Sequence, residues 1–178
     1  MAALFLVEEI EGGYFDKLRA IPIPRYSIVL GRLVAEGAKG IFISSLILVL
    51  ALPFGITIAS GPEGFILIVA LSALWGIVYA GFMQLIALKT RSAAATNSGG
   101  LIFFPLLFLT PNFVPRDMLT EPMEVAATLN PVTYLMEALR SLILDDLDWE
   151  KILPGFAVVA ALGVVMLILN IRMIRNYD

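Results

Sequence analysis

The sequence contains no cysteine and no histidine among its 178 residues. Disulfides, thiol nucleophiles, Cys/His zinc sites and histidine acid–base catalysis are therefore excluded. The phosphate-binding pattern GxxxxGK[ST] is also absent. The nearest string, Gly31 to Lys39, has the wrong spacing and lacks the final hydroxyl residue. We therefore expect no catalytic residue, no metal site and no nucleotide or other cofactor bound by this chain.

Charge is scarce as well. Charged residues make up 15% of the chain, 60% of the residues are hydrophobic, and the mean hydropathy is +0.92. About 20 apolar helical residues cross the hydrocarbon core of a bilayer. We therefore predict a single all-α domain over residues 1–178, a polytopic helical membrane protein in contact with lipid. Its four expected spans cover residues 40–59, 65–88, 93–113 and 152–171.

The third expected span is interrupted by Pro105 and Pro111, and the polar stretch before it, Lys89 to Gly100, reads as a turn. Ahead of the first span, Arg32, Glu36 and Lys39 share one helix face and are expected to pair at the membrane surface. Within the spans, Gln84 is the most polar side chain. The absence of charge there argues against a proton- or ion-driven carrier.

Two polar modules flank this apolar core. Residues 14–20 are predicted to form a short amphipathic helix between the breakers Gly12-Gly13 and Pro22. Asn130 and Pro131 are a helix start, with Asn as cap and Pro at the first helical position. The helix they begin, 131–144, is expected to lie in the membrane interface or dip partway in. Its polar face carries Thr133, Glu137, Arg140 and Ser141.

The acidic run from Asp145 to Glu150 lacks the glycine and the register of a calcium loop. We interpret it as a solvated outer face with Trp149 as an interface anchor. Ser72, Gly76 and Ala80 form a row of small residues that allows close helix packing in lipid, and we expect two permease halves to pack through it. Nine of the twelve Lys and Arg residues fall on one predicted side of the membrane, which places both termini in the cytoplasm.

Both modules resemble the type-2 permease subunits of ATP-binding cassette (ABC) exporters, a family of drug-resistance, polysaccharide and lipid exporters. A cytoplasmic loop of that family has the form acidic–x–Gly–Gly–x–x–Asp–x–Leu–x–x–x–Pro–x–x–Arg. Its outer segment carries F-x-P and, further on, N-P-x-x-Y…R. The matching loop residues are Glu11, Gly12, Gly13, Asp16, Leu18, Pro22 and Arg25, with Lys17 among them; the matching outer residues are Phe113, Pro115, Asn130, Pro131, Tyr134 and Arg140.

The resemblance implies that 14–20 is a coupling helix that docks on a separate ATPase subunit, which binds ATP and Mg. It also implies a second permease copy, in a homo- or heterodimer, and an outer gate or exit path around 131–144. The transported molecule would be an amphipathic drug, lipid or glycan, exported across the plasma membrane. No nucleic-acid partner is expected. From the residues alone, 14–20 also fits an ordinary cytoplasmic loop held at the headgroups by Lys17 and Arg19.

Permeases of this family usually have six spans, and this chain reads as if it begins at the end of the second. We therefore expect a fragment, a split subunit or a mis-started reading frame. Two rival functions stay open at this point. One is a membrane-integral enzyme that uses the outer acids, such as Asp146 and Asp148, on a lipid-linked substrate. The other is a truncated assembly subunit that does not transport.

Overall fold

A computed structural model describes Leu4, Val7, Glu8 and Gly12, and residues 25–110, 120–145 and 147–175. These residues are helical or lie in turns and short connections, and none of them is in a strand. The elements are α3 (Arg25–Ala51), the short 3-10 helix η1 (Leu52–Phe54), α4 (Gly61–Thr90), α5 (Ala93–Gly100), α6 (Phe103–Phe108), α7 (Glu121–Leu129), α8 (Pro131–Leu144) and α9 (Trp149–Arg175).

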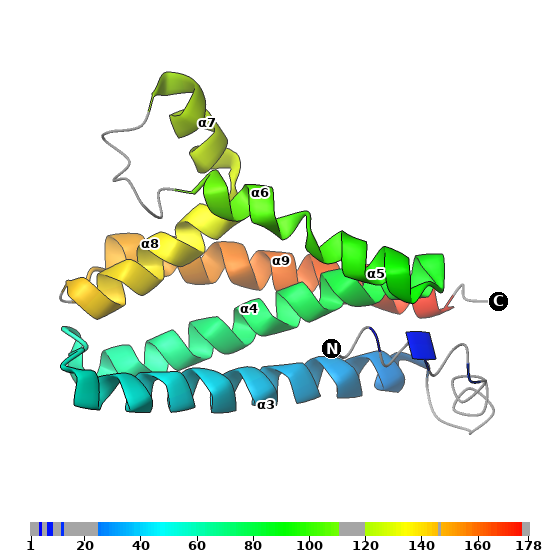
Figure 1. The fold of residues 1–178 in the computed structure, drawn as a ribbon, viewed down its shortest axis with the longest axis horizontal. Helices are drawn as coiled ribbons and strands as arrows, with labels where there is room; N and C mark the ends of the chain where they lie inside the picture. The colour runs from blue at the N-terminus through cyan, green and yellow to red at the C-terminus, as the bar shows by residue number, and fades with distance from the viewer. Residues whose placement is uncertain are drawn as a thin grey trace.

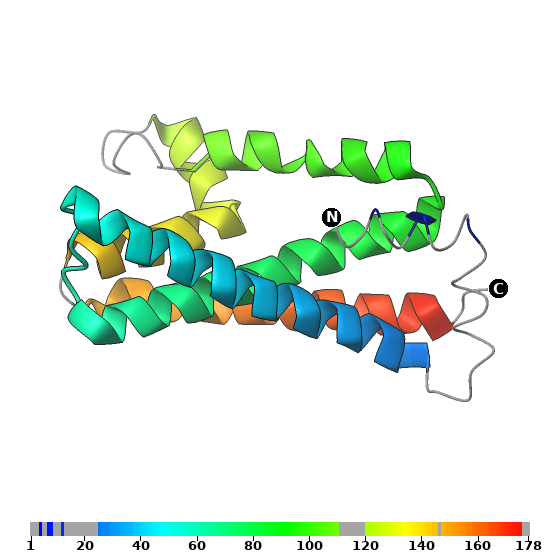
Figure 2. The same cartoon turned by 60° about the horizontal axis from the view of Figure 1, so that its bottom comes forward.

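In the described part of the chain, three helices are long and apolar enough to cross a membrane. They are Tyr26–Phe54, which joins α3 to η1, Gly61–Thr90 and Trp149–Arg175. Each is about 40 Å long at 1.5 Å per residue, which exceeds the roughly 30 Å hydrocarbon core. Figures 1 and 2 show α3, α4 and α9 lying along one another. The all-α membrane class is therefore confirmed, with three long helices and the shorter apolar stretch Ala93–Phe108 among the described residues.

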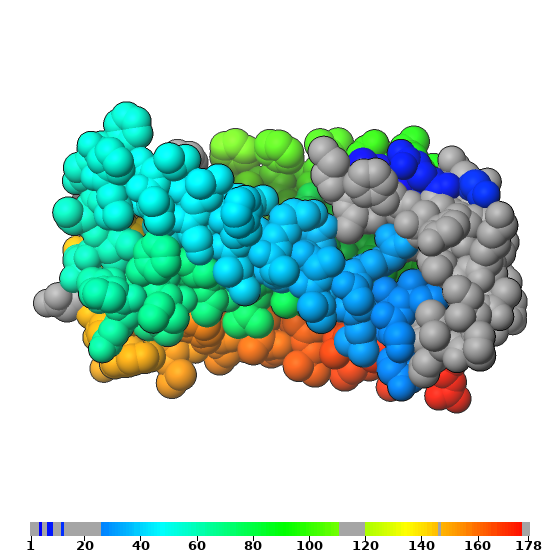
Figure 3. Space-filling view, turned by 90° about the horizontal axis from the view of Figure 1, so that it is seen from below, coloured from blue at the N-terminus to red at the C-terminus, as the bar shows by residue number. Residues whose placement is uncertain are grey.

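The helix ends form two groups at opposite ends of the bundle. The start of α3, the end of α4, the start of α5 and the end of α9 meet at one end of the bundle (Figure 1). The α3–α4 turn and the α8–α9 linker lie at the other end. Figure 3 views the bundle from the side on which α3 crosses in front of its neighbours. The basic helix ends are thus separated in space from the acidic linker, as the sequence predicts.

The first expected span, 40–59, coincides with a helix only in part, and its bounds in the membrane stay a prediction. Helix α3 begins fifteen residues earlier, at Arg25, and Ile56 to Ala59 lie outside any helix. Pro53 falls in the 3-10 turn that ends the helix. A Cβ built on Gly37 would lie 3.0 Å from Ile77 Cδ1, and one built on Gly40 would lie 3.0 Å from Ala73 Cα. Glycine at these two positions therefore allows the first half of α3, which carries the charged residues, to pack closely against the middle of α4.

The third expected span, 93–113, is two short helices, α5 and α6, and its last three residues lie outside the described part of the chain. The expected polar turn from Lys89 to Gly100 is wrong, because most of it is helical. Ser92 caps α5: its Oγ accepts from Ala95 N at 3.4 Å, and its carbonyl accepts from Thr96 Oγ1 at 2.9 Å. The turn is confined to Arg91 and Ser92.

An aromatic cluster holds α6 on α4. The ring of Phe103 meets three rings of α4 edge-to-face, with centroid distances of 6.0, 4.8 and 5.3 Å to Trp75, Tyr79 and Phe82. Those three residues are spaced by about one helical turn, so they share one side of α4. Edge-to-face contacts of this kind stabilise a pair beyond simple burial. The second half of the broken segment, α6, therefore packs on α4 through the Phe103 ring.

Helix α8 has the same bounds as the helix expected at 131–144, and it packs inside the bundle along α9 (Figure 1). Its buried Leu135 and Ala138 form a core cluster with Leu71 and Val78 of α4 and Val159 of α9. A Cβ on Gly155 would lie 2.5 Å from Ala138 Cβ and 2.8 Å from the Tyr134 carbonyl oxygen. Glycine at 155 therefore permits the close contact between α8 and α9.

Candidate functional site

The tip of the α7–α8 hairpin lies part-way along the bundle, not at its end (Figures 1 and 2). Asn130 stands at this tip and is 4% exposed. Its Oδ1 accepts from Val132 N at 3.0 Å, which caps α8, and Nδ2 donates to the Leu106 carbonyl of α6 at 2.6 Å. One side chain thus starts α8 and ties it to the broken segment.

Tyr134 makes a second link at the same place. Its hydroxyl donates to the Thr128 carbonyl in the last turn of α7 at 3.0 Å. Asn130, Pro131 and Tyr134 of the predicted outer gate are therefore brought together, where α6, α7 and α8 meet. Arg140 is exposed, two turns further along α8. Phe113 and Pro115 lie outside the described residues.

The polar face expected for α8 is partly buried. Thr133 is fully buried and Ser141 is 1% exposed, and neither hydroxyl has a hydrogen-bond partner. An unsatisfied buried hydroxyl costs about 1–3 kcal/mol. At the far end of α8, Ala59 N donates to the Ile143 carbonyl at 3.0 Å, and Ser60 Oγ donates to the Leu142 carbonyl. The α3–α4 turn therefore satisfies the last carbonyls of α8.

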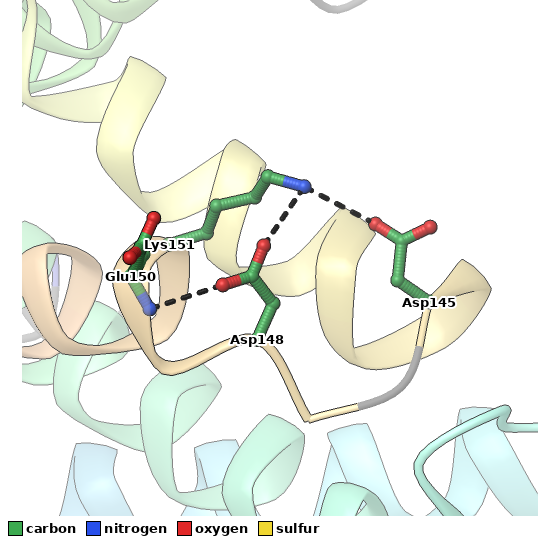
Figure 4. A network of polar contacts seen from close by, with 4 residues as sticks. All are labelled: Asp145, Asp148, Glu150 and Lys151. Atoms are coloured by element: carbon green, nitrogen blue, oxygen red, sulfur yellow. Dashed lines mark hydrogen bonds and ion pairs between the residues drawn. The ribbon is translucent and has the colours of Figure 1, made fainter.

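The α8–α9 linker carries a network of charges (Figure 4). Asp148 accepts from Glu150 N at 3.1 Å through Oδ1 and pairs with Lys151 Nζ at 3.1 Å through Oδ2. Lys151 Nζ also lies 3.5 Å from Asp145 Oδ2. Hydrogen bonding by Lys151 lowers the pKa of Asp148. Asp148 caps α9 and closes the linker, so its carboxylate has a structural role. Asp146 lies outside the described residues.

Most of the predicted coupling segment falls outside the described residues: Glu11, Gly13, Asp16, Lys17, Leu18 and Pro22. Gly12 sits in a turn whose N–H donates to the Glu8 carbonyl at 2.8 Å, and Arg25 is the first residue of α3. Just before the segment, Val7 is fully buried in a cluster with Val29 and Leu33 of α3, Ala87 and Leu88 of α4 and Ile174 of α9. This residue therefore belongs to a core cluster that joins the ends of all three long helices.

The row of small residues packs within the chain at two of its positions. A Cβ on Gly76 would lie 3.8 Å from the Glu36 carbonyl oxygen of α3. Ala80 packs on the cluster that contains Val29 and Leu33 of the same helix. Ser72 is half-buried. Contact between two copies through this row stays a prediction.

An ion pair lies on α3 in the part that packs on the middle of α4. Lys39 Nζ is 2.6 Å from Glu36 Oε1. This part of α3 precedes the first expected span, 40–59, and the contacts of Gly37 and Gly40 place it beside the middle of α4. The expectation that the spans carry no charge stays a prediction.

Asn170 is a buried amide that the sequence reasoning missed when it ranked Gln84 as the most polar side chain in the spans. It is fully buried in α9. Its Nδ2 donates to the Gly81 carbonyl of α4 at 2.9 Å and to the Met166 carbonyl at 2.8 Å, while Oδ1 has no partner. The sequence alone indicates this residue, because an amide near the end of an apolar run needs hydrogen-bond partners within the protein.

Similarity to known proteins extends over most of the chain. The family model described as "ABC-2 type transporter" matches residues 1–144. The chain is 24% identical over 160 residues to the protein named "Inner membrane transport permease YhhJ" from Escherichia coli (strain K12), covering 89% of this chain and 42% of that protein. The Shigella flexneri protein of the same name matches equally.

The chain thus spans about two fifths of the length of these relatives. No solved structure matches the chain. The family model covers both predicted motifs and reaches the end of α8. The chain therefore belongs to the ABC-2 type transporter family.

Proposed function

We propose that this chain is the permease part of an ATP-driven ABC exporter in the inner membrane, with both termini in the cytoplasm. A separate ATPase subunit binds ATP and Mg, docks on residues 14–20 and drives outward movement of an amphipathic drug, lipid or glycan. A second permease copy completes the pathway. The match to the ABC-2 type transporter family over residues 1–144 carries the proposal, because that range contains both motifs.

The packing around Val7 supports the coupling role of the segment that follows it. Val7 is buried against residues of α3, α4 and α9 at the end of the bundle where basic helix ends gather. Force applied to a short helix joined to this residue would act on three long helices at once. A packed interior transmits such strain because it is nearly incompressible.

The hairpin tip supports a gate part-way along the pathway. Asn130 holds α8 to α6 through one hydrogen bond, and Tyr134 holds α8 to α7 through another. Rotation of α6 against α8 would therefore have to break a small number of polar contacts. Two orphaned hydroxyls, on Thr133 and Ser141, are available in α8 to take new partners after such a rotation.

The experiment uses the intact transporter in its native membrane. The tagged permease is purified in mild detergent, and copurifying ATPase and export are measured for Gly13→Pro and Asp16→Lys. We expect both variants to lose the ATPase and export. Glu121→Lys makes the same charge change on exposed α7 and should retain both. If Gly13→Pro and Asp16→Lys keep the ATPase and export at the unmodified level, the proposal is wrong.

The enzyme alternative receives no such support. It needs outer carboxylates that are available to a substrate, whereas Asp148 is used by the α9 cap and by Lys151. The family match is to transporters rather than to enzymes. We therefore propose transport alone.

A further inference from the structure

Three charged residues form a strip along one side of α3, which we call the α3 charged strip: Arg32, Glu36 and Lys39. They are spaced at i, i+4 and i+7, so they share one helix face. Lys39 pairs with Glu36 at 2.6 Å, and the lysine side chain is 47% exposed against 18% for the glutamate. The pair therefore presents its ammonium group outward and keeps its carboxylate behind it.

The depth of the strip follows from contacts with α4. Residues 65–88 of α4 carry no charge, and the middle of that run is at Gly76 and Ile77. Gly37 packs on Ile77, and Gly76 packs on the Glu36 carbonyl. Glu36 therefore lies beside the centre of the apolar run of α4, with Arg32 and Lys39 one turn to either side.

Helix α9 gives the same depth independently. Its uncharged run, 152–171, is centred near residue 162. A Cβ on Gly163 would lie 3.7 Å from Val78 Cγ2, and one on Gly81 would lie 3.0 Å from Met166 Cβ. The centres of the two uncharged runs are therefore level with each other, and both are level with Glu36. No other Asp, Glu, Lys or Arg lies at this level among the described residues of α4 and α9.

An ammonium group that is half exposed at this depth is incompatible with contact to lipid chains. We propose that the α3 charged strip lines a water-filled part of the transport pathway in the middle of the membrane, and that Lys39 binds an anionic group of the transported molecule. The bound anionic group is a carboxylate or a phosphate. The ammonium group of Lys39 is a cation that faces outward, and it has three hydrogen-bond donors, of which Glu36 takes one.

The identity of the anion as part of a transported molecule rests on the proposed export function. The water-filled site does not, and it can be measured without ATP or substrate. The chain has no cysteine of its own, so single cysteines report the environment directly. Ala35 is exposed and lies one helical turn before Lys39 on the same side. Val34, its neighbour, is 68% exposed and points about 140° away from Lys39.

Ala35→Cys leaves the strip intact, and Val34→Cys is the matched control at the same depth. Both are placed in the intact transporter in membranes. The rate of modification by a membrane-impermeant anionic reagent, sulfonatoethyl methanethiosulfonate, is compared with that by its cationic trimethylammonium analogue. Each rate is divided by the rate with free cysteine in buffer. We expect Ala35→Cys to react about tenfold faster than Val34→Cys, because the thiolate forms only in water.

The anionic reagent should be favoured at Ala35→Cys by roughly threefold or more, and Lys39→Gln in the same background should abolish that preference. Equal and slow reaction at both positions would overturn the proposal, since lipid or protein would then cover the strip. Fast reaction with no charge preference would overturn the anion site. If the strip reacts as expected while no ATPase copurifies, the export function fails and the hydrated strip stands.

Discussion

The side-chain amide of Asn130 donates to the backbone carbonyl of Leu106 at 2.6 Å, across 24 residues of sequence. The same side chain accepts from Val132 N. Leu106 belongs to α6, a helix that ends two residues later at Phe108. The bond therefore joins a broken membrane segment to the tip of a hairpin that enters the bundle.

Asn130→Ala should lower the stability of the protein by about 1–2 kcal/mol through loss of the α8 cap, and by more through the stranded Leu106 carbonyl. Asn130→Ser keeps a side-chain oxygen that can cap α8, but it cannot reach Leu106. Its loss of stability should be smaller than that of Asn130→Ala. Thermal unfolding of the purified protein in lipid nanodiscs measures both. Equal stability of all three proteins would show that neither bond matters.

Gly155→Ala should destabilise the contact between α8 and α9 by about 1–3 kcal/mol, because the new methyl group would overlap Ala138 Cβ and the Tyr134 carbonyl. Gly163→Ala is the control in the same helix, since the nearest atom to its Cβ is 3.7 Å away. It should be tolerated. Thermal unfolding and disulfide trapping between α8 and α9 report the displacement. A Gly155→Ala protein as stable as Gly163→Ala would contradict the close packing.

The Asp148–Lys151 pair predicts a pH dependence at the start of α9. The pKa of Asp148 is lowered in the folded protein, so its contribution is present above the ordinary aspartate pKa and is lost as pH falls through the lowered value. The effect is small, since the pair is exposed to solvent. Protection factors for amide exchange at Glu150 to Ile152 should fall on acidification. Asp148→Asn should show reduced protection near neutral pH and little further change in acid.

Asn170→Ala should cost about 1 kcal/mol or more, because it removes the hydrogen bond between α9 and α4 and leaves a small cavity beside Gly81. Leu169→Ala is the control: Leu169 is 41% exposed at the neighbouring position. Unfolding in denaturant compares the two variants in the same lipid. A larger loss for Leu169→Ala than for Asn170→Ala would show that the buried amide does not join the helices.

Local patterns predicted much of the fold. Long apolar runs indicate the three long helices, and the Asn130-Pro131 pair marks the first residue of α8. In each case the signal is carried by neighbouring residues: hydropathy over one helix length, or a cap followed by proline. The same applies to the break in the third expected span: α5 ends at Gly100, and Pro105 lies in the first turn of α6.

Features that depend on contacts between helices were not predictable. The strip of α3 looked like a surface segment because its charges end an apolar run, while Gly37 and Gly40 place it beside the middle of α4. The sequence from Ala93 to Gly100 looked like a turn because it is small and polar, yet Ser92 caps it as a helix. Asn170 became significant only through its bond to Gly81. Hydropathy does not show which residues of two helices contact each other.

Cross-linking from the predicted coupling helix tests most directly whether residues 14–20 dock on an ATPase subunit. A single cysteine at Leu18 in the otherwise cysteine-free chain is treated with a short photoactivatable thiol reagent in the intact transporter. Val125→Cys on exposed α7 is the control. We expect the Leu18→Cys protein to be trapped against an ATPase subunit, with a yield that changes when ATP is added, and the Val125→Cys protein not to be trapped. A Leu18→Cys protein that never traps an ATPase in assembled transporters would contradict it.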